Sequence, residues 1–191
     1  MNGLLSLSTP ASVYPISLLE LKAQLRLSHN DDAVMLVNLI AAACQYIEDA
    51  SGQAIMAQTW KYSVDCAPVE RLTLPKHPVT AITAIDYFDT DNAAQSANLS
   101  DFTLYDSGTD AWIEPVADKE WPAVYDRPDA LSITFTAGGA ADRYRNLKQA
   151  ALKLAAEWYE NPNASSDRSQ SGLPFGVAEL VNLSRRNWIT A

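Results

Sequence analysis

A double change of hydrophobic periodicity constrains the fold of this chain more than any other feature. Apolar residues recur every three to four positions up to Gly52, and from Ala54 they fall into short runs of β-branched and aromatic residues. After Gly138-Gly139 the helical period returns. A short helical pair cannot cover all of its apolar surface alone, so the two helical flanks should pack together. We therefore predict an α+β fold: a helical bundle from the N- and C-terminal helices, with an inserted small antiparallel β-domain.

The predicted bundle comprises residues 16–52 plus 140–183. Ser17 and Glu20 have the spacing of a capping box, which marks the start of a first, short helix. Further helices are expected from about 142 to 160 and from 175 to 183.

The second predicted helix, Asp32 to Ser51, is apolar on nearly all sides. Gly52 is its expected C-terminal cap. A helix with so little polar surface must be covered on most sides. It is therefore expected to be either the centre of the bundle or part of a contact between subunits.

The remaining segments complete the predicted domain organisation. Residues 53–139 form the inserted β-domain, in which five or six short strands are separated by prolines and turn residues. Residues 1–15, which contain two prolines, are expected to be a flexible or extended arm. Residues 184–191 are a polar C-terminal tail.

Charge limits the partners that the chain can have. Its formal net charge is −9, and its densest basic cluster is the pair Arg185-Arg186. Duplex DNA attracts proteins with clustered Lys and Arg, so we expect no sequence-specific nucleic acid binding. No continuous apolar run approaches the length of a membrane helix, so we also expect no membrane partner.

No motif for catalysis, cofactor binding or metal binding is found. The two histidines, His29 and His77, lie outside metal-ligand spacings and are expected to be solvated loop residues. The two cysteines, Cys44 and Cys66, are expected to be buried free thiols. We therefore predict no catalytic residue, no cofactor and no metal, and a protein that is not an enzyme.

Aromatic residues and prolines alternate between positions 112 and 128. Trp112, Trp121 and Tyr125 lie near Pro115, Pro122 and Pro128. Such a cluster can form a shelf that binds a sugar or a peptide, although aromatic residues more often anchor loops and fill cores. Both interpretations stay open at this point.

A series of short motifs resembles the phage head-tail connector (adaptor) proteins in order and spacing. It begins with the leucine-rich first helix and Leu25-Arg26, then Asp31-Asp32, Leu39-Ile40-Ala41-Ala42 and Tyr46-Ile47-Glu48. The series continues through Gln58-Thr59-Trp60, Leu74-Pro75-Lys76-His77-Pro78, Trp121-Pro122 and Thr136-Ala137-Gly138-Gly139. It ends with Trp158-Tyr159-Glu160-Asn161 and Leu173-Pro174-Phe175-Gly176. The resemblance extends from about residue 16 to residue 186.

The resemblance implies a structural virion protein that forms a ring below the twelve-fold portal. Such a ring extends the DNA channel and joins the head to the tail. The implied partners are other copies of the chain, the portal protein, and a stopper or tail-completion protein. The implied location is the virion, with the host cytoplasm during assembly. The alternatives are another head-completion subunit, a tail-terminator subunit, or a carbohydrate- or peptide-binding module.

The C-terminal tail supplies the predicted partner-binding residues. Arg185, Arg186 and Trp188 lie outside the helical pattern, and Trp and Arg often dominate the energetics of interfaces. We expect these three residues to contact the portal. In the alternative interpretation, Trp188 packs back onto its own bundle.

Overall fold

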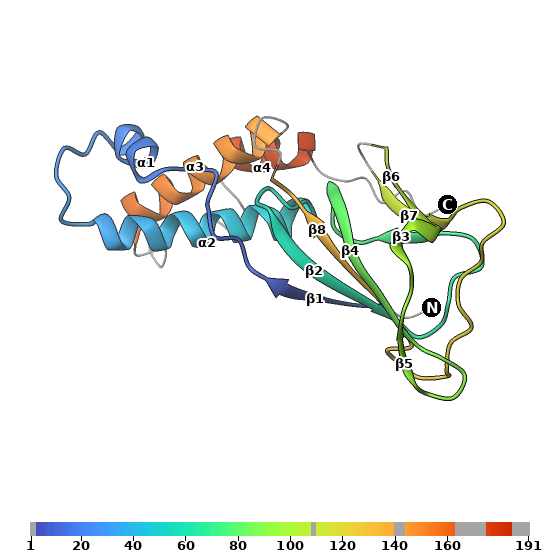
Figure 1. The fold of residues 1–191 in the computed structure, drawn as a ribbon. Coiled ribbons are helices and arrows are strands. Elements are labelled where there is room, and N and C mark those ends of the chain that lie inside the picture. Colours follow the sequence, from blue (N-terminus) through green and yellow to red (C-terminus); the bar gives the residue numbers. More distant parts are fainter. Residues whose placement is uncertain (1–2, 108–109, 140–143, 163–174, 185–191) are drawn as a thin grey trace. The chain divides into compact units, whose positions relative to one another are not determined.

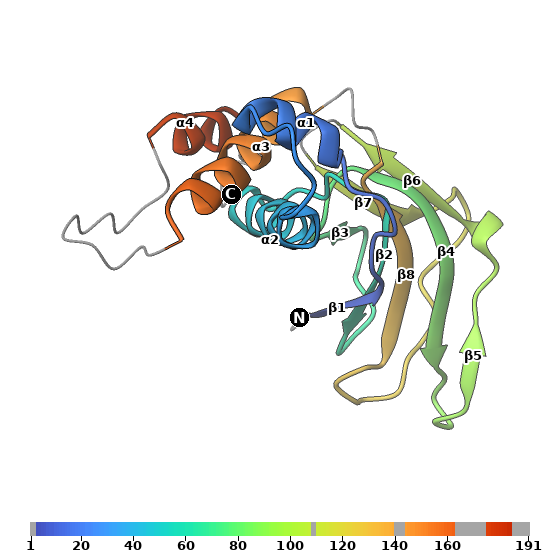
Figure 2. The same ribbon diagram turned by 90° about the vertical axis from the view of Figure 1, so that its left-hand side faces the viewer.

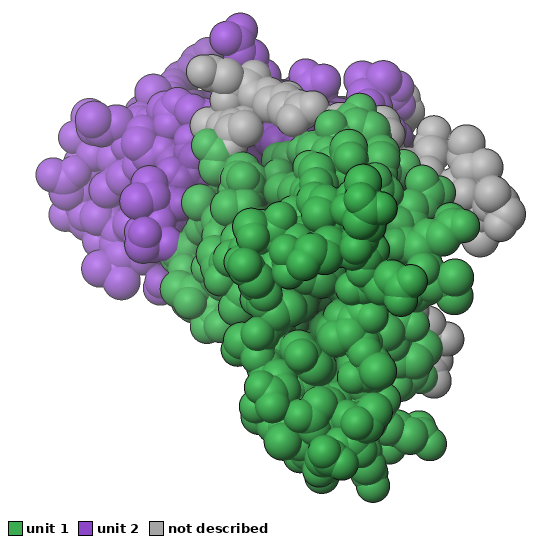
Figure 3. Space-filling model, turned by 45° about the vertical axis from the view of Figure 1, so that its right-hand side comes forward, with its two compact units in different colours: residues 1–11, 57–139 green, residues 12–56, 140–191 purple. Residues whose placement is uncertain are grey.

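The computed structural model describes residues 3–107, 110–139, 144–162 and 175–184. Contacts within the chain divide it into two compact units, which are shown in different colours in Figure 3. The β unit consists of residues 1–11 and 57–139, and the helical unit consists of residues 12–56 and 140–191. Each unit therefore combines segments that are far apart in the sequence.

The helical unit is built around two long helices that lie side by side in both ribbon views (Figures 1 and 2). α3 packs along α2, and both α1 and α4 contact these two helices. The bounds of the helices are Leu18–Leu25 for α1, Ala33–Ser51 for α2, Arg145–Glu160 for α3 and Phe175–Ser184 for α4.

The ends of α1 and α2 follow the signals in the sequence. The Ser17 hydroxyl accepts a hydrogen bond from the Glu20 backbone N–H, and the Glu20 carboxylate accepts one from the Ser17 N–H at 2.7 Å. This is the predicted capping box, which satisfies two otherwise free donors. Gly52 ends α2 in the left-handed conformation, with φ of 73°, and its N–H donates to the Glu48 carbonyl oxygen.

Aliphatic side chains from all four helices form the core of the helical unit. α2 and α3 contribute small residues, which allow the helices to approach closely, between larger leucines and isoleucines. The buried apolar residues include Leu21, Leu36, Ile40, Ala43, Ile47, Leu147, Ala151, Leu154, Val177 and Val181.

The β unit contains two antiparallel sheets. The larger sheet has the strand order β1-β2-β8-β4-β5, and the smaller one has the order β3-β7-β6. The first three strands are Gly3–Thr9 (β1), Gln58–Val64 (β2) and Leu72–Leu74 (β3). The next three are Val79–Phe88 (β4), Ala94–Ser96 (β5) and Phe102–Asp106 (β6), with a short 3-10 helix, Leu99–Asp101, before β6. The last two are Ala111–Pro115 (β7) and Leu131–Ala137 (β8).

β8 is the central strand of the larger sheet and pairs with both β2 and β4. Its alternating residues Leu131, Ile133 and Phe135 are fully buried, as the alternation of apolar residues predicts. The predicted α+β fold, a helical bundle with an inserted antiparallel β-domain, is confirmed.

The N-terminal segment, expected to be a flexible or extended arm, contains a strand. Residues 3–9 form β1, an edge strand that pairs with β2 and belongs to the β unit. Six of its seven residues are exposed, so β1 has no buried apolar stripe that would reveal a strand in the sequence. Its pairing depends on the edge of β2 instead. At Gly3 an added Cβ would collide with the Tyr62 phenol, so a larger residue would require the Tyr62 side chain to move.

Among the described residues, α2 has the length and composition of a helix that could span a membrane. It has 19 residues, and its most apolar 18-residue window has a mean hydropathy of 1.3, with 33% of that window buried. One such helix is weak evidence for a membrane span, because core helices of soluble proteins meet the same criterion.

Candidate assembly surface

One side of α2 is apolar, and none of the residues that the structure describes buries it fully. Val34 is 77% exposed, and Met35, Val37 and Tyr46 are 44–46% exposed. The opposite side of the same helix carries the buried residues that face the bundle. Near the start of α2, Ala33, Val34, Val37 and Asn38 line a shallow, almost entirely apolar groove of about 260 Å³. We call the exposed residues Val34, Met35, Val37, Asn38 and Tyr46 the α2 outer face.

The α2 outer face is also free of charge. No Asp, Glu, Lys or Arg occurs from Ala33 to Ile47. Fifteen helical residues correspond to about 22 Å of surface at about 1.5 Å per residue. A second copy of an acidic protein can approach such a surface without like-charge repulsion. The exposure and the neutrality together make this face a candidate for contact between subunits.

Contacts to α3 hold the two ends of the α2 outer face in place. The Tyr159 hydroxyl donates a hydrogen bond to Asp32 Oδ2 at 2.7 Å, at the start of α2. This bond to the carboxylate raises the pKa of Tyr159, and desolvation and the charge of Asp32 act in the same direction. Further along the helix, Tyr46 packs edge-to-face on Trp158, with ring centroids 6.0 Å apart. α2 is thereby fixed to α3 at two points.

An ion pair joins α1 to α3. Lys148 Nζ lies 2.6 Å from Glu20 Oε1, and the two side chains are 34% and 42% exposed. Hydrogen bonding from Lys148, followed by that from the Ser17 backbone, lowers the pKa of Glu20 to about 2. Glu20 therefore serves both the capping box and the contact between the two helices.

The ion pair gives the helical unit a predictable pH dependence. Because the folded state lowers the pKa of Glu20 from 4.5 to about 2, its stabilisation is present above about pH 4.5 and is lost as the pH falls toward 2. We expect Glu20→Gln to lower the free energy of unfolding by about 0.5–1 kcal/mol at pH 7, because the pair is partly exposed and screened. Urea denaturation of Glu20→Gln and of the parent chain at several pH values measures this difference.

The matched control for Glu20→Gln is Glu160→Gln, which neutralises an exposed carboxylate at the end of α3. We expect that control to change stability little at any pH. A Glu20→Gln deficit of equal size at pH 7 and at about pH 2 would show that packing, and not charge, is responsible.

A buried carboxylate fixes the chain where it leaves α2. Glu48 is 5% exposed, and its Oε1 accepts hydrogen bonds from the backbone N–H groups of Ile55 at 2.6 Å and Met56 at 3.0 Å. This role is structural, because backbone donors bind the carboxylate. The sequence pattern gave no sign of it: Glu48 and Asp49 are adjacent and resemble any polar helix end. The role of Glu48 becomes visible only in the structure, where residues 53–56 turn back toward α2.

Two predictions about titratable residues were wrong in part. His77 is 1% exposed rather than solvated, and its Nδ1 lies 3.6 Å from Asp106 Oδ1. Cys66 is exposed, whereas Cys44 is buried as predicted, and desolvation raises the pKa of the Cys44 thiol to about 12. His29 lies in the loop before α2, 3.6 Å from Asp31. Within the described ranges, no group of three or more His, Cys, Asp or Glu residues could hold a metal ion.

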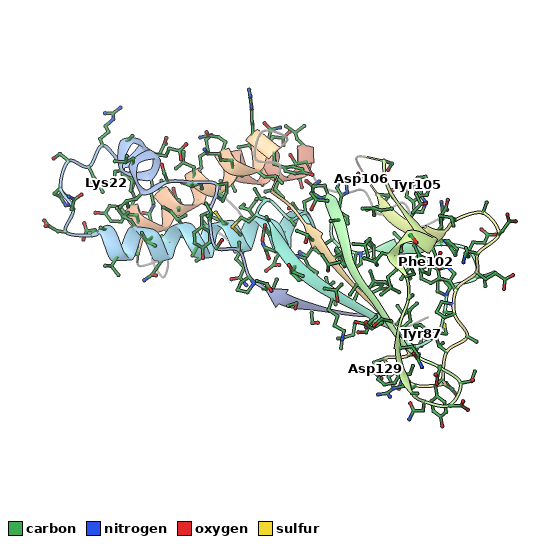
Figure 4. All side chains as sticks on the ribbon, viewed as in Figure 1. Lys22, Tyr87, Phe102, Tyr105, Asp106 and Asp129 are labelled. Atoms are coloured by element: carbon green, nitrogen blue, oxygen red, sulfur yellow. The ribbon has the colours of Figure 1, made fainter. Side chains whose placement is uncertain are left out.

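The structure separates the aromatic residues that are close in sequence. Trp112 stacks on Tyr105 with centroids 5.4 Å apart, and Arg71 lies 5.5 Å from the Trp112 ring centre. Trp121 instead packs against Phe102 at 4.8 Å. Phe102 and Tyr105 are both labelled on β6 in Figure 4. Of the two interpretations left open by the sequence, a shelf or loop-anchoring residues, neither joins Trp112 and Trp121 directly: they belong to two separate aromatic pairs in the β unit.

The predicted partner-binding residues Arg185, Arg186 and Trp188 lie outside the described residues. The described part of the chain ends with α4 at Ser184, whose carbonyl oxygen accepts a hydrogen bond from Gln53 Nε2. The tail thus begins directly after a helix end that is fixed to the segment following α2.

The fold and the uncovered helix face together define a structural α+β protein with a surface suited to assembly. The model of the head completion protein family matches residues 16–180, and the chain belongs to this family. No curated protein matches the chain.

Solved structures of gene transfer agent (GTA) particles contain chains with the same fold. A chain in the neck of the empty GTA particle, computed with C6 symmetry, has a TM-score of 0.76 at 23% identity, with 95% of each chain covered. A chain in the virion of the native particle has a TM-score of 0.73 at 24% identity, with 95% of this chain and 94% of that chain covered. A chain in the native neck computed with C12 symmetry has a TM-score of 0.69 at 24% identity and the same coverage.

These findings confirm the sequence-based assignment to the phage head-tail connector type of protein, with a structural role. The family match carries the identification, and the similar structures show that the fold extends over nearly the whole chain.

Proposed function

We propose that this protein is a head-tail connector subunit that forms a ring of about twelve copies below the portal. The ring extends the DNA channel and joins the head to the tail. Membership of the head completion family is the observation that carries this proposal. Chains of the same fold in necks computed with C6 and C12 symmetry support it.

The α2 outer face supplies a contact for the proposed ring. In a closed ring, each subunit presents two different faces to its two neighbours. An apolar, uncharged helix face is suited to one side of such a heterologous contact, because it can be buried against a neighbouring acidic copy without like-charge repulsion.

The distribution of charge supports a channel through which DNA passes without binding. The β unit contains thirteen Asp and Glu residues against five Lys and Arg residues, whereas the helical unit contains ten against nine. A surface with this excess of negative charge repels a polyanion. No sequence-specific contact with nucleic acid and no membrane contact are part of the proposed function.

The proposed partners are the portal on one side of the ring and a stopper or tail-completion protein on the other. We assign the portal contact to Arg185, Arg186 and Trp188. The role is structural: the proposal includes no enzymatic activity, cofactor or metal. The subunit is located in the virion at the head-tail interface, and in the host cytoplasm during assembly.

Reconstitution on heads tests this function. Purified full-length chain is added to heads that carry the portal but lack this protein, and electron microscopy then images the necks. We expect a ring of about twelve copies below the portal. A chain that ends at Ser184 keeps the hydrogen bond to Gln53 and should melt like the full chain, yet fail to dock.

The packing of Trp188, the portal contact of the tail and the connector function are each tested by a different outcome. If Trp188 packs onto its own bundle, the shortened chain loses roughly 3 kcal/mol of stability, the cost of removing a buried Trp. A shortened chain that docks with full affinity refutes the portal contact of the tail. A full-length chain that never joins the heads refutes the connector function itself.

A further inference from the structure

A groove of about 550 Å³ opens on the β unit, and it is lined by none of the residues assigned above to the ring or portal contact. Three segments line it: residues 67–70 after β2, Glu114 and Pro115 at the end of β7, and residues 119–123. The walls combine three prolines, Pro68, Pro115 and Pro122, with the Trp121 ring. This is the part of the aromatic and proline cluster that the proposed function leaves without a role.

The position of Trp121 in this groove is fixed from two directions. Its Nε1–H donates a hydrogen bond to the Glu70 carbonyl oxygen at 3.0 Å. Its ring packs against Phe102 on β6 with centroids 4.8 Å apart. Because the indole N–H is already bonded, Trp121 offers a partner an apolar surface in a fixed orientation. Val69, in the lining segment 67–70, is 98% exposed.

The polar groups around the groove are mostly negatively charged. Glu70, Glu114 and Glu120 line it, and the single lining cation, Lys119, lies 3.4 Å from Asp101 in an ion pair. Carboxylates accept hydrogen bonds but do not donate them at neutral pH. An occupant that complements this surface therefore carries cationic donors.

Rigid apolar walls formed by prolines and an aromatic ring fit an extended polyproline II segment, which binds grooves of this kind at a low cost in conformational entropy. Hydrogen bonds from cationic groups to carboxylates are stronger than those from the neutral hydroxyls of a sugar, so the carboxylates favour a basic peptide. We propose that the groove binds an extended, proline-containing basic segment of a partner protein. The binding site lies within the β unit, so the proposal stands whether or not the ring forms.

Fluorescence anisotropy with labelled peptides tests the proposal on the full-length chain. The probe is a peptide of five Pro-Arg repeats, with Gly-Arg and Pro-Glu peptides of equal length as comparisons. At physiological salt we expect the Pro-Arg peptide to bind, the Gly-Arg peptide to bind at least about fivefold more weakly, and the Pro-Glu peptide not to bind. The difference in affinity between the Pro-Arg and Gly-Arg peptides measures the contribution of the proline walls. The difference between the Pro-Arg and Pro-Glu peptides measures the contribution of charge.

Two double variants locate the site. Glu114→Gln with Glu120→Gln should weaken binding of the Pro-Arg peptide by about tenfold. Asp91→Asn with Asp126→Asn removes the same charge from the β unit outside the groove and should leave binding unchanged. Thermal melting of both variants shows that the fold is retained.

Four outcomes overturn the proposal. They are no binding of the Pro-Arg peptide, equal binding of the Gly-Arg peptide, equal weakening by the two double variants, and binding of chitohexaose in place of the peptide. The last outcome would assign the groove to a carbohydrate.

Discussion

Replacing Ile40 with aspartate is expected to abolish folding. Ile40 is 3% exposed and lies on the side of α2 that faces the bundle. An aspartate there would be a buried charge without a partner, which costs several kcal/mol, comparable to the whole stability of about 5–15 kcal/mol for a domain. Soluble yield and far-ultraviolet circular dichroism measure the outcome.

Val37→Asp is the matched control for this prediction, because it places the same charge one turn earlier on the same helix. Val37 is 44% exposed, so the charge remains in water, and the fold should be retained. The neighbouring Leu39 is only half-buried, so Leu39→Asp should have an intermediate effect. Parent-like melting of Ile40→Asp would show that the assignment of this helix face is wrong.

The helices could be predicted because their signals are local. The capping box at Ser17 and the glycine cap at Gly52 are short patterns with a direct structural meaning, and both occur where they were expected. The alternation of apolar and polar residues in β8 is equally easy to recognise in the sequence, because a strand at the centre of a sheet buries at least every second residue.

β1 and His77 could not be predicted because their structure depends on distant residues. β1 is exposed on nearly its whole length, and the edge of β2, more than fifty residues away, determines that it is a strand. His77 lies between Lys76 and a proline, which is typical of a solvated loop, yet it is buried near Asp106. Single-sequence patterns record a residue's neighbours along the chain, not its neighbours in space.

The candidate surfaces were predictable to different degrees. The sequence showed that α2 has too many apolar residues for a one-sided helix, but left open whether the bundle or a second subunit covers the excess. The structure divides these residues, with Ile40 and Ile47 in the core and Val34 and Val37 exposed. The groove beside Trp121 joins Pro68 and Pro115, which are too far apart in sequence to suggest one site.

Replacing Val34 and Val37 together with glutamate is expected to abolish the ring while leaving the subunit folded. Both residues are exposed, so the charges cost little in the free subunit. In the proposed ring each contact would bury these charges without partners, at about 2–5 kcal/mol each. Two such charges weaken each contact by at least about a thousandfold, and the loss recurs around the ring. Sedimentation velocity and negative-stain microscopy, under conditions where the parent chain assembles, measure the change.

The control for the Val34 and Val37 variant is Leu19→Glu with Leu183→Glu, which changes two exposed leucines on α1 and α4. These leucines are 77% and 69% exposed, so the control adds the same charge and removes a similar apolar area elsewhere on the helical unit. We expect it to assemble like the parent. Val34→Gln with Val37→Gln should weaken the ring by less than the glutamates, because an amide loses apolar contact without introducing a charge. If the glutamate variant still forms rings, the subunits meet through a different surface. If the control variant dissociates as well, then net charge, and not the α2 outer face, governs assembly.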